Sequence, residues 1–289
     1  MKNIKFCLIA LFILTLSPLQ ANQTRMSTLM TGIFIDDITN INIFPHQLIK
    51  YRNSLYADVT ETLQNYGIML SPETKYGAFG CWQNIEENQG FNIGYAVNIA
   101  RFDIGIAGSP IKDHTNFGVG LGRTYFNRRF DLSFVLYNEP NTTRYTFNLR
   151  LSRRKGDFII IPAYSLNYVS NDEDLDTHKF GLMFKRLILN EGFVYLAGEY
   201  ELINNSEIND LLHIYSGLEL PIGKHIVLLC GIKETMTYKF ESPEWRIEPG
   251  ISLRIREFSF DFQINSERFF DDDVNLLKSV GFDLDFSKF

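Results

Sequence analysis

Acidic and basic side chains recur in the middle of segments that otherwise alternate between apolar and polar residues. Alternate residues of a strand face opposite sides, so these charges share one face, while Phe, Ile, Leu and Val occupy the other. Carboxylate and guanidinium groups on one face can pair as a network that holds an interior together, or form a ring that selects charged solutes. We expect the network first, with the ring as the alternative. The residues concerned are Asp103, Asp131, Arg150, Arg246, Glu248, Arg254 and Asp261.

Other chemistry finds little support in the sequence. The five histidines are scattered, without the spacing of a metal site. His213 and Ser216 would face opposite sides of a strand, so they cannot form a catalytic pair there. No nucleophile elbow, phosphate-binding loop or zinc motif is present. We therefore expect no enzyme, no cofactor and no metal, and the net charge of −6 argues against nucleic acid as a partner.

The alternating segments are joined by connections of two kinds. Short connections at 100–101, 127–128, 154–156, 190–192, 222–223 and 256 alternate with long polar ones such as 83–90 and 265–275. Short turns at one end and long loops at the other are typical of an outer-membrane β-barrel, with apolar side chains toward lipid and polar ones toward the lumen. A soluble β-sandwich also alternates, but its loops should be similar at both ends.

Aromatic residues support the same fold class. A phenylalanine follows most short connections within one or two residues, and these phenylalanines are Phe102, Phe130, Phe158, Phe193 and Phe258. Their common position predicts an aromatic girdle at one membrane interface.

The expected fold is an all-β, transmembrane antiparallel β-barrel of about fourteen strands, the first at about 75–82 and the last at about 277–286. An even number places both ends of the barrel on the side of the short turns. Leu55–Val59 and Tyr66–Leu70 leave an alternative open, because they are either two further strands, making sixteen, or part of an N-terminal plug. The expected divisions are a signal peptide over 1–21, a plug or hatch-like segment over 22–70, and the barrel over 71–289.

The N-terminus has the pattern of a secretory signal peptide. Lys2 and Lys5 precede the apolar stretch Phe6–Ser17, which is too short to span a bilayer as a helix, and Ala21 offers a cleavage site. With the barrel pattern, this predicts the outer membrane of a Gram-negative-type bacterium. The expected partners are outer-membrane lipids, lipopolysaccharide and the barrel-assembly machinery, whose signal the terminal Phe289 resembles.

A short motif between the signal peptide and the barrel carries a family resemblance. Asp36-Asp37, Pro45 and Leu48 stand where the long-chain fatty-acid transporter family, and its secretion-associated relatives, carry paired aspartates, a proline and an apolar residue. Phe44 replaces the usual Asn and His46 the usual Ala, so the motif is partial. The resemblance implies that this segment folds into the lumen as a hatch, and that hydrophobic molecules leave through a side opening at a kinked strand.

Several residues could bend the barrel wall to make such an opening. Gly118, Gly120 and Gly122 form a stripe without side chains on the lumen face of one strand, and Pro162 and Pro249 each remove a backbone donor in mid-strand. For the glycines, room for a packed plug or curvature of the barrel is the alternative. For the prolines, it is a tolerated bulge.

These patterns leave three functions open. The first is passive uptake of a small, hydrophobic molecule, as the resemblance implies. The second is a plugged structural or secretion-associated barrel that acts through partners. The third is a general porin, which the charges on the inner face would suit.

Overall fold

The structure is a computed structural model that describes residues 23–60, 64–71, 73–83, 91–109, 115–139, 142–170, 175–188, 192–205, 209–271 and 273–286. The predicted signal peptide, most of the predicted connection at 190–192 and Phe289 lie outside these residues. Among the described residues, no helix is long and apolar enough to cross a bilayer.

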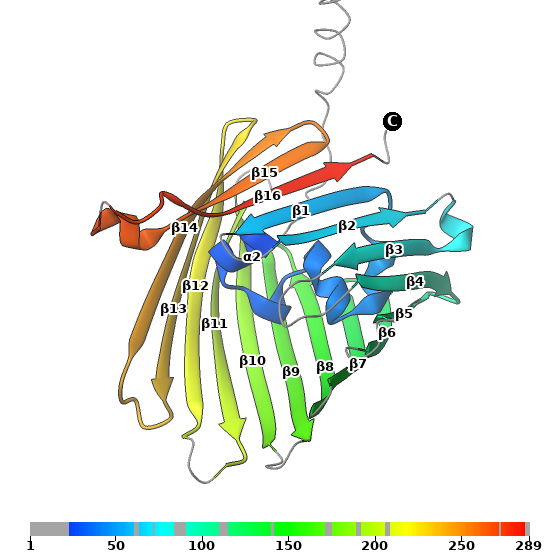
Figure 1. The fold of residues 1–289 in the computed structure, drawn as a ribbon, viewed down its shortest axis with the longest axis horizontal. Coiled ribbons are helices and arrows are strands. Elements are labelled where there is room, and N and C mark those ends of the chain that lie inside the picture. Colours follow the sequence, from blue (N-terminus) through cyan, green and yellow to red (C-terminus); the bar gives the residue numbers. More distant parts are fainter. Residues whose placement is uncertain are drawn as a thin grey trace, which may run out of the picture.

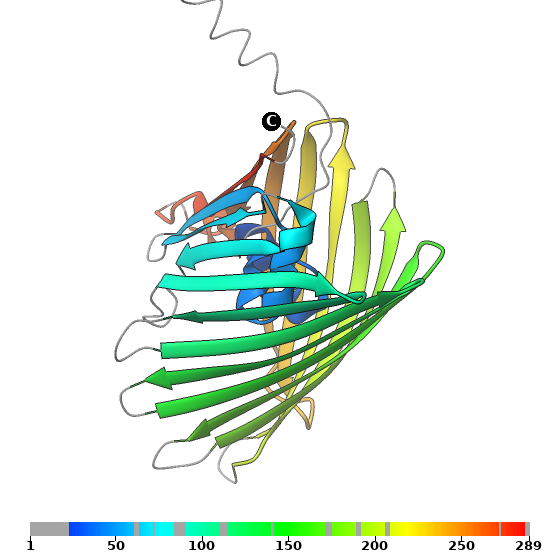
Figure 2. The ribbon, with the colours of Figure 1, turned by 90° about the vertical axis from the view of Figure 1, so that its right-hand side faces the viewer.

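Sixteen antiparallel strands form one closed barrel in which each strand pairs with its neighbours in the chain and β1 pairs with β16 (Figures 1 and 2). The strands are β1 Ser54–Thr60, β2 Gln64–Leu70, β3 Ala78–Gln83, β4 Phe91–Ile99, β5 Phe102–Ser109, β6 Thr115–Tyr125, β7 Arg128–Glu139, β8 Thr142–Lys155, β9 Phe158–Ser170, β10 Leu175–Ile188, β11 Gly192–Ile203, β12 Leu211–Ile222, β13 Ile226–Thr237, β14 Glu244–Ile255, β15 Phe258–Ile264 and β16 Leu277–Asp285. Short 3-10 helices, η4 Thr74–Tyr76 and η7 Ser266–Phe269, lie in connections.

The expectation of fourteen strands is wrong, and the alternative of sixteen is confirmed. The barrel wall begins at Ser54 rather than at residue 71, because β1 and β2 are wall strands. The partner of β1 on its other side is β16, with Ser54 opposite Asp285. A pairing between the two ends of the chain leaves no local pattern, so the alternation of residues could not decide it.

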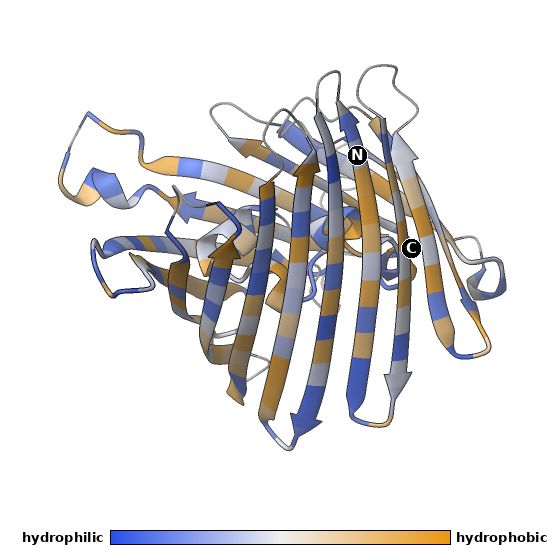
Figure 3. Ribbon diagram, turned by 90° about the horizontal axis from the view of Figure 1, so that it is seen from below, coloured by the Kyte–Doolittle hydropathy of each residue, from blue (hydrophilic) through white to orange (hydrophobic). Residues whose placement is uncertain are grey.

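The two faces of the wall differ in polarity, as the alternation predicts. Figure 3 shows hydrophobic and hydrophilic residues alternating along the strands. Ile106, Phe117, Phe180 and Leu196 are exposed on the outer face, whereas Asp131 is buried in the lumen. So much exposed apolar surface suits contact with lipid.

One member of the predicted girdle does not belong to it. Phe193 is buried and packs with Tyr195 and Ala197 inside the barrel, because residues of odd number face inward on β11. Phe158, in contrast, is exposed, as a girdle residue should be.

Residues 23–51, here called the lumen segment, fold inside the barrel (Figures 1 and 2). The segment contains helix α2 Gln23–Leu29 and the 3-10 helices η1 Gly32–Phe34, η2 Ile38–Asn42 and η3 Pro45–Ile49. Asp37 caps η2 by accepting a hydrogen bond from the backbone N–H of Thr39, and Pro45 occupies the first turn of η3, where its missing N–H costs nothing. Helices this short depend on packing, here against the wall.

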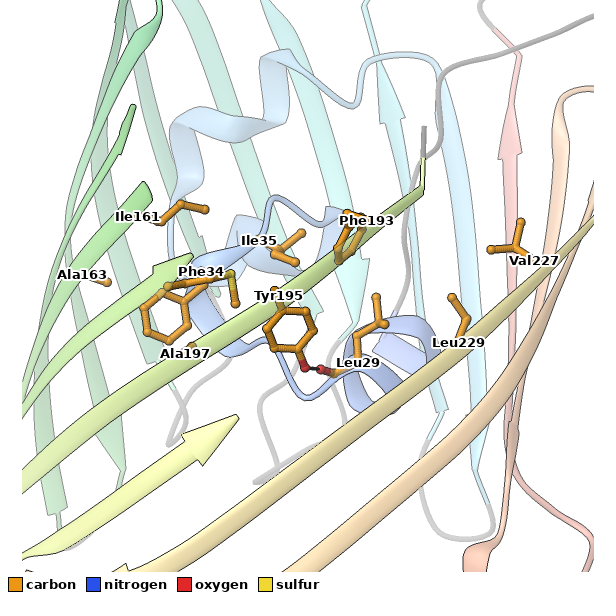
Figure 4. Packing of buried hydrophobic residues seen from close by; sticks show 11 residues of the cluster. Leu29, Phe34, Ile35, Ile161, Ala163, Phe193, Tyr195, Ala197, Val227 and Leu229 are labelled. Carbon is orange, nitrogen blue, oxygen red and sulfur yellow. Dashed lines mark hydrogen bonds between the residues drawn. The ribbon is translucent and has the colours of Figure 1, made fainter. Parts of the chain in front are cut away.

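Two apolar clusters attach the lumen segment to opposite parts of the wall. In the first, Leu29, Phe34 and Ile35 pack against side chains of β9, β10, β11 and β13 (Figure 4). The hydroxyl of Tyr195 in this cluster donates a hydrogen bond to the carbonyl of Leu29. The second cluster places Ile38, Ile41 and Leu48 against these residues of the first strands: Tyr56, Met69, Trp82 and Ala96.

The glycine stripe of β6 leaves room for the lumen segment to pack against the wall. A Cβ on Gly120 would lie 2.5 Å from Nδ1 of His46, and one on Gly122 would lie 2.5 Å from Cδ2 of the same ring. A Cβ on Gly118 would lie 3.2 Å from Cγ of Pro45. Strand β6 pairs with β5 and β7 along its length without a shift in register, so these glycines give room to η3 and do not kink the wall.

The two prolines differ in their effect on the wall. At Pro162 the β8–β9 ladder is interrupted between the pairs Arg150–Ala163 and Arg153–Ile160, with the same register on both sides. Pro249 pairs with Cys230 of β13, but β14 pairs with β15 only from Gly250 onward. Pro249 therefore lies where the pairing of β14 with β15 ends.

Trp82 can report whether the lumen segment is docked. Its Nε1 donates to Asn42 Oδ1 at 2.5 Å, and its side chain is 1% exposed, whereas the other tryptophan, Trp245, is 64% exposed. In a Trp245→Phe background, Gly120→Leu should increase quenching of Trp82 by acrylamide, because the new side chain takes the space of His46. Gly198→Leu is the matched control, since no atom of the residues that the structure describes lies within 4 Å of a Cβ there. Equal quenching of Trp82 in the two variants would contradict the idea that the glycine stripe makes room for the lumen segment.

Candidate functional site: a lumen segment held by ion pairs

Arg150 of β8 joins the lumen segment to the wall. Its guanidinium donates to Oδ2 of Asp131 on β7, from Nε at 3.2 Å and Nη2 at 2.7 Å, and Nη2 also contacts Oδ1 of Asp36 in the lumen segment. Nη1 donates to the carbonyl of Ile33 at 2.9 Å. The same group lies 5.0 Å from the ring centroid of Phe44. One buried cation thus holds a wall carboxylate, a carboxylate of the segment and the segment's backbone.

Further groups balance the charge around this pair. Asp131 also contacts Nε2 of His46 at 2.8 Å and Nε of Arg129 at 2.8 Å. Arg129 reaches Asp103 at 3.1 Å, and Lys50 lies 2.5 Å from Oδ2 of Asp36. Buried charges are tolerated only when paired and hydrogen-bonded, and the docked lumen segment adds Asp36, His46 and Lys50 to the ion pairs that the wall residues make among themselves.

A second ion-pair site lies on the far side of the lumen. Glu219 of β12 is buried between Arg254 of β14, at 2.5 Å, and Arg25 of α2, whose Nε lies 3.0 Å away. Asp261 of β15 is fully buried and adds negative charge close to both arginines. Arg25 of the lumen segment therefore joins a charge cluster of the wall. Asp36 of the same segment joins the other cluster, around Arg150, across the lumen.

The start of α2 makes a third attachment. The carboxylate of Asp58 on β1 accepts hydrogen bonds from the backbone N–H groups of Gln23, at 3.1 Å, and Thr24, at 2.9 Å. The first amides of a helix have no partner within it, so a wall carboxylate satisfies them here.

Asp37 is the least balanced charge of the lumen segment. Its side chain is fully buried, and Oδ2 has no hydrogen-bond partner among the described residues, while Oδ1 accepts from Thr39. Burial raises the pKa of Asp37 from 3.8 to about 7, against the smaller lowering effects of Thr39 and Arg25.

A cavity of about 1150 Å³ lies between the lumen segment and the end of the barrel that carries the longer loops. This space is here called the vestibule. Its floor includes Met26, Ile33, Phe34 and Asn40 of the lumen segment. Polar and charged residues of the wall form much of its lining, among them Asn65, Arg144, Asn148, Asn167, Lys179, Glu199, Lys233, Arg246, Glu248, Gln263 and Lys278.

The structure places all seven predicted charged residues on the lumen side, in three groups. Asp103, Asp131 and Arg150 belong to the network around Asp36, and Arg254 and Asp261 belong to the group around Glu219. Arg246 and Glu248 line the vestibule, where Glu248 contacts Lys278 at 2.5 Å. The hatch residues Asp36, Asp37, Pro45 and Leu48 all lie in the lumen segment. Asp36, Pro45 and Leu48 contact the wall, whereas Asp37 is buried and hydrogen-bonded to Thr39.

The sequence analysis did not identify three important partners. Arg25 is the only lysine or arginine between positions 22 and 49, which is a usable signal for a charge with a fixed partner. His46 gave no signal, because its importance comes from Asp131 and the glycines of β6, which lie far away in the chain. Glu199 and Glu201 share one face of β11, but only strand pairing brings His213 to them, so linear spacing could not reveal that cluster.

No protein-family model matches the sequence, and no curated protein does. Among solved structures, a trimeric, in-vitro folded OmpT, an outer membrane protein of Vibrio cholerae, is similar with a TM-score of 0.51 and 8% identity, over 80% of this chain and 95% of that chain. CdiB from Acinetobacter baumannii has a TM-score of 0.49 and 9% identity, over 80% of this chain and 58% of that one. The anion-selective porin from Comamonas acidovorans has a TM-score of 0.48 and 9% identity, over 80% and 95%. The likeness to OmpT shows the fold of an outer-membrane β-barrel, and it does not show the fatty-acid transporter family.

Removing the central cation should loosen the lumen segment. We expect Arg150→Met to weaken docking by about 3 kcal/mol, the low end for a broken buried pair, because Arg129 and Lys50 still compensate Asp131 and Asp36. Arg246→Met is the control, since that side chain is 69% exposed and 3.7 Å from Glu248, and it should cost less than about 1 kcal/mol. The urea dependence of Trp82 quenching measures the loss of docking free energy in each of the two variants. Similar costs for the two variants would refute the special role of Arg150.

The buried Asp37 should make docking depend on pH. Its pKa is raised to about 7, so between about pH 4 and 7 the docked segment binds more protons than the released one, and docking weakens as pH rises. Burial lowers the pKa of His46, which acts in the opposite direction below pH ~6.5, so the comparison must be with a variant. Relative to the wild type, Asp37→Asn should become more firmly docked as pH rises from 5 to 8, measured by the urea midpoint of Trp82 quenching. If the difference in docking stability between Asp37→Asn and the wild type stays constant with pH, the raised pKa of Asp37 is contradicted.

Proposed function

We propose that this protein is an outer-membrane barrel for uptake of small polar solutes, kept closed by its own lumen segment. The observation that carries this proposal is the attachment of the segment on several sides of the lumen. It pairs with Glu219 on β12, with Arg150 and Asp131 on β8 and β7, and with Asp58 on β1. A general porin needs an open water-filled lumen, and this arrangement disfavours one.

The lining of the vestibule supports a polar solute. Basic residues outnumber acidic ones among the described lining residues, and asparagines alternate with them, so the space suits a small molecule with hydrogen-bonding groups and negative charge. The fatty-acid transporter resemblance instead implies a hydrophobic solute. That solute would find apolar side chains chiefly on the floor, from Ile33, Phe34 and Ile43.

Passage to the periplasm requires the lumen segment to move. Its contacts with the wall combine buried ion pairs with apolar packing, and both are lost together when it leaves. We infer that the wall stays closed while the segment rearranges, because the sixteen strands pair in a complete ring without it.

A second function is favoured by the same attachments. A segment held by several buried ion pairs can also be a permanent part of the barrel, and the protein would then act through its loops and partners. The two functions differ in whether the lumen can open at all.

Conductance across planar bilayers separates these functions. We expect the wild type to be closed, and Arg25→Met/Arg150→Met to show conductance steps, because the lumen segment loses its ion pairs on both sides of the lumen. Arg246→Met serves as the control and should stay closed. A steady open conductance of the wild type would contradict the closed barrel. A double variant that is silent although Trp82 shows an undocked segment would favour the permanent plug.

A further inference from the structure

Three side chains with metal-binding groups meet in the wall of the barrel, outside the ion-pair sites described above. Glu199, Glu201 and His213 each present a ligand atom, and these atoms all lie within 4.8 Å of one another. We propose that they form a binding site for a divalent transition-metal ion such as Zn²⁺. The site is independent of the lumen segment and goes beyond the proposed uptake function.

Strand geometry explains why these residues converge. Glu199 and Glu201 are two residues apart on β11, so they share the lumen face. His213 of β12 lies directly opposite Glu199 in the pairing of the two strands. Side chains opposite or diagonal on neighbouring strands are close enough to share one ion, and the strands hold their backbones rigidly.

The surroundings orient the ligands. Nδ1 of His213 lies 3.0 Å from Oγ1 of Thr235, and the hydroxyl of Tyr215 donates to Oε1 of Glu199 at 3.1 Å. A threonine hydroxyl can donate or accept, so Thr235 can hold the ring in the tautomer whose Nε2 binds a metal. Nε2 of His213 points to Oε2 of Glu201, 2.9 Å away, and a metal would replace the proton between them.

One lysine competes with a metal for these carboxylates, and a second lies nearby. Nζ of Lys179 lies 3.0 Å from Oε2 of Glu201, and Nζ of Lys233 lies 5.3 Å from the ring centroid of Tyr215. A bound divalent ion would displace Lys179 from Glu201, so the lysine reduces affinity and does not prevent binding. Its side chain is 38% exposed and borders the vestibule, so it has space to move away.

The ligand set defines the class of ion. An imidazole favours Zn²⁺, Cu²⁺ or Ni²⁺ over Mg²⁺ and Ca²⁺, which prefer oxygen ligands alone. Three protein ligands leave a further coordination position for water or a solute group. Glu199 lines the vestibule, so this open position can be reached from that space.

Titration calorimetry of the full-length, tag-free barrel with Zn²⁺ tests the proposal. The wild type should bind one ion, His213→Ala should lose affinity by at least tenfold, and Thr235→Val should lose on the order of tenfold. Lys179→Met should bind more tightly than the wild type, because the competing ammonium is gone. His178→Ala is the matched control, since that histidine contacts Tyr164 and Phe180 and lies outside the cluster. It should bind as the wild type does.

Two results would overturn the proposal: absence of Zn²⁺ binding by the folded wild type, or binding that His213→Ala and His178→Ala reduce equally. With each variant made in the Trp245→Phe background, protection of Trp82 from acrylamide verifies that it is folded. If His213→Ala does not fold, Glu199→Gln/Glu201→Gln replaces it and must lose the ion. If Lys179, Glu201 and His213 form only a structural network, Lys179→Met should be less stable than the wild type, and neither protein should bind Zn²⁺ measurably. That result would also contradict the metal site.

Discussion

A charge inside a barrel must find its counter-charge there, and in this protein the N-terminal segment supplies much of it. Arg150 is the central case, because its guanidinium joins Asp131 of the wall to Asp36 of the lumen segment. Arg25 reverses the roles, bringing a cation from the segment to Glu219 of the wall. The segment thus adds ion pairs to charges that also have partners in the wall, namely Arg150 with Asp131 and Glu219 with Arg254, and docking joins the two sets.

The shape of the wall, like its charges, is matched to the lumen segment. The stripe of glycines on β6 leaves a groove in which Pro45 and His46 lie, and other close approaches occur at Gly80, Gly94 and Gly181. A barrel that enclosed only water would not need glycines at positions where a second element packs directly against the wall. Above the segment the lining changes to lysine, arginine and asparagine, so in the closed state that we propose the lumen would still have a polar chamber on the side of the loops.

Alternation of residues was sufficient to predict a barrel and the lumen side of each charged residue, since side-chain direction in a strand is a local property. It could not decide the strand number, because β1 closes the ring with β16 from the other end of the chain. It also placed Phe193 at a membrane interface, although odd-numbered residues face inward on β11. The contacts of Arg25 with Glu219 and of His46 with Asp131 depend on how the lumen segment docks. The position of His213 opposite Glu199 depends on strand register, and alternation alone gives neither.

Hydrogen–deuterium exchange of the full-length protein tests the closed lumen most directly. The amides of Phe44 and Gln47 are hydrogen-bonded within the lumen segment, to Asn40 and Phe44, and the segment is buried in the wall. We predict that amides 38–50 exchange as slowly as those of β7 and β8. Exchange as fast as that of the exposed connection at 239–243 would contradict a docked lumen segment and, with it, the account of a barrel closed by its own N-terminus.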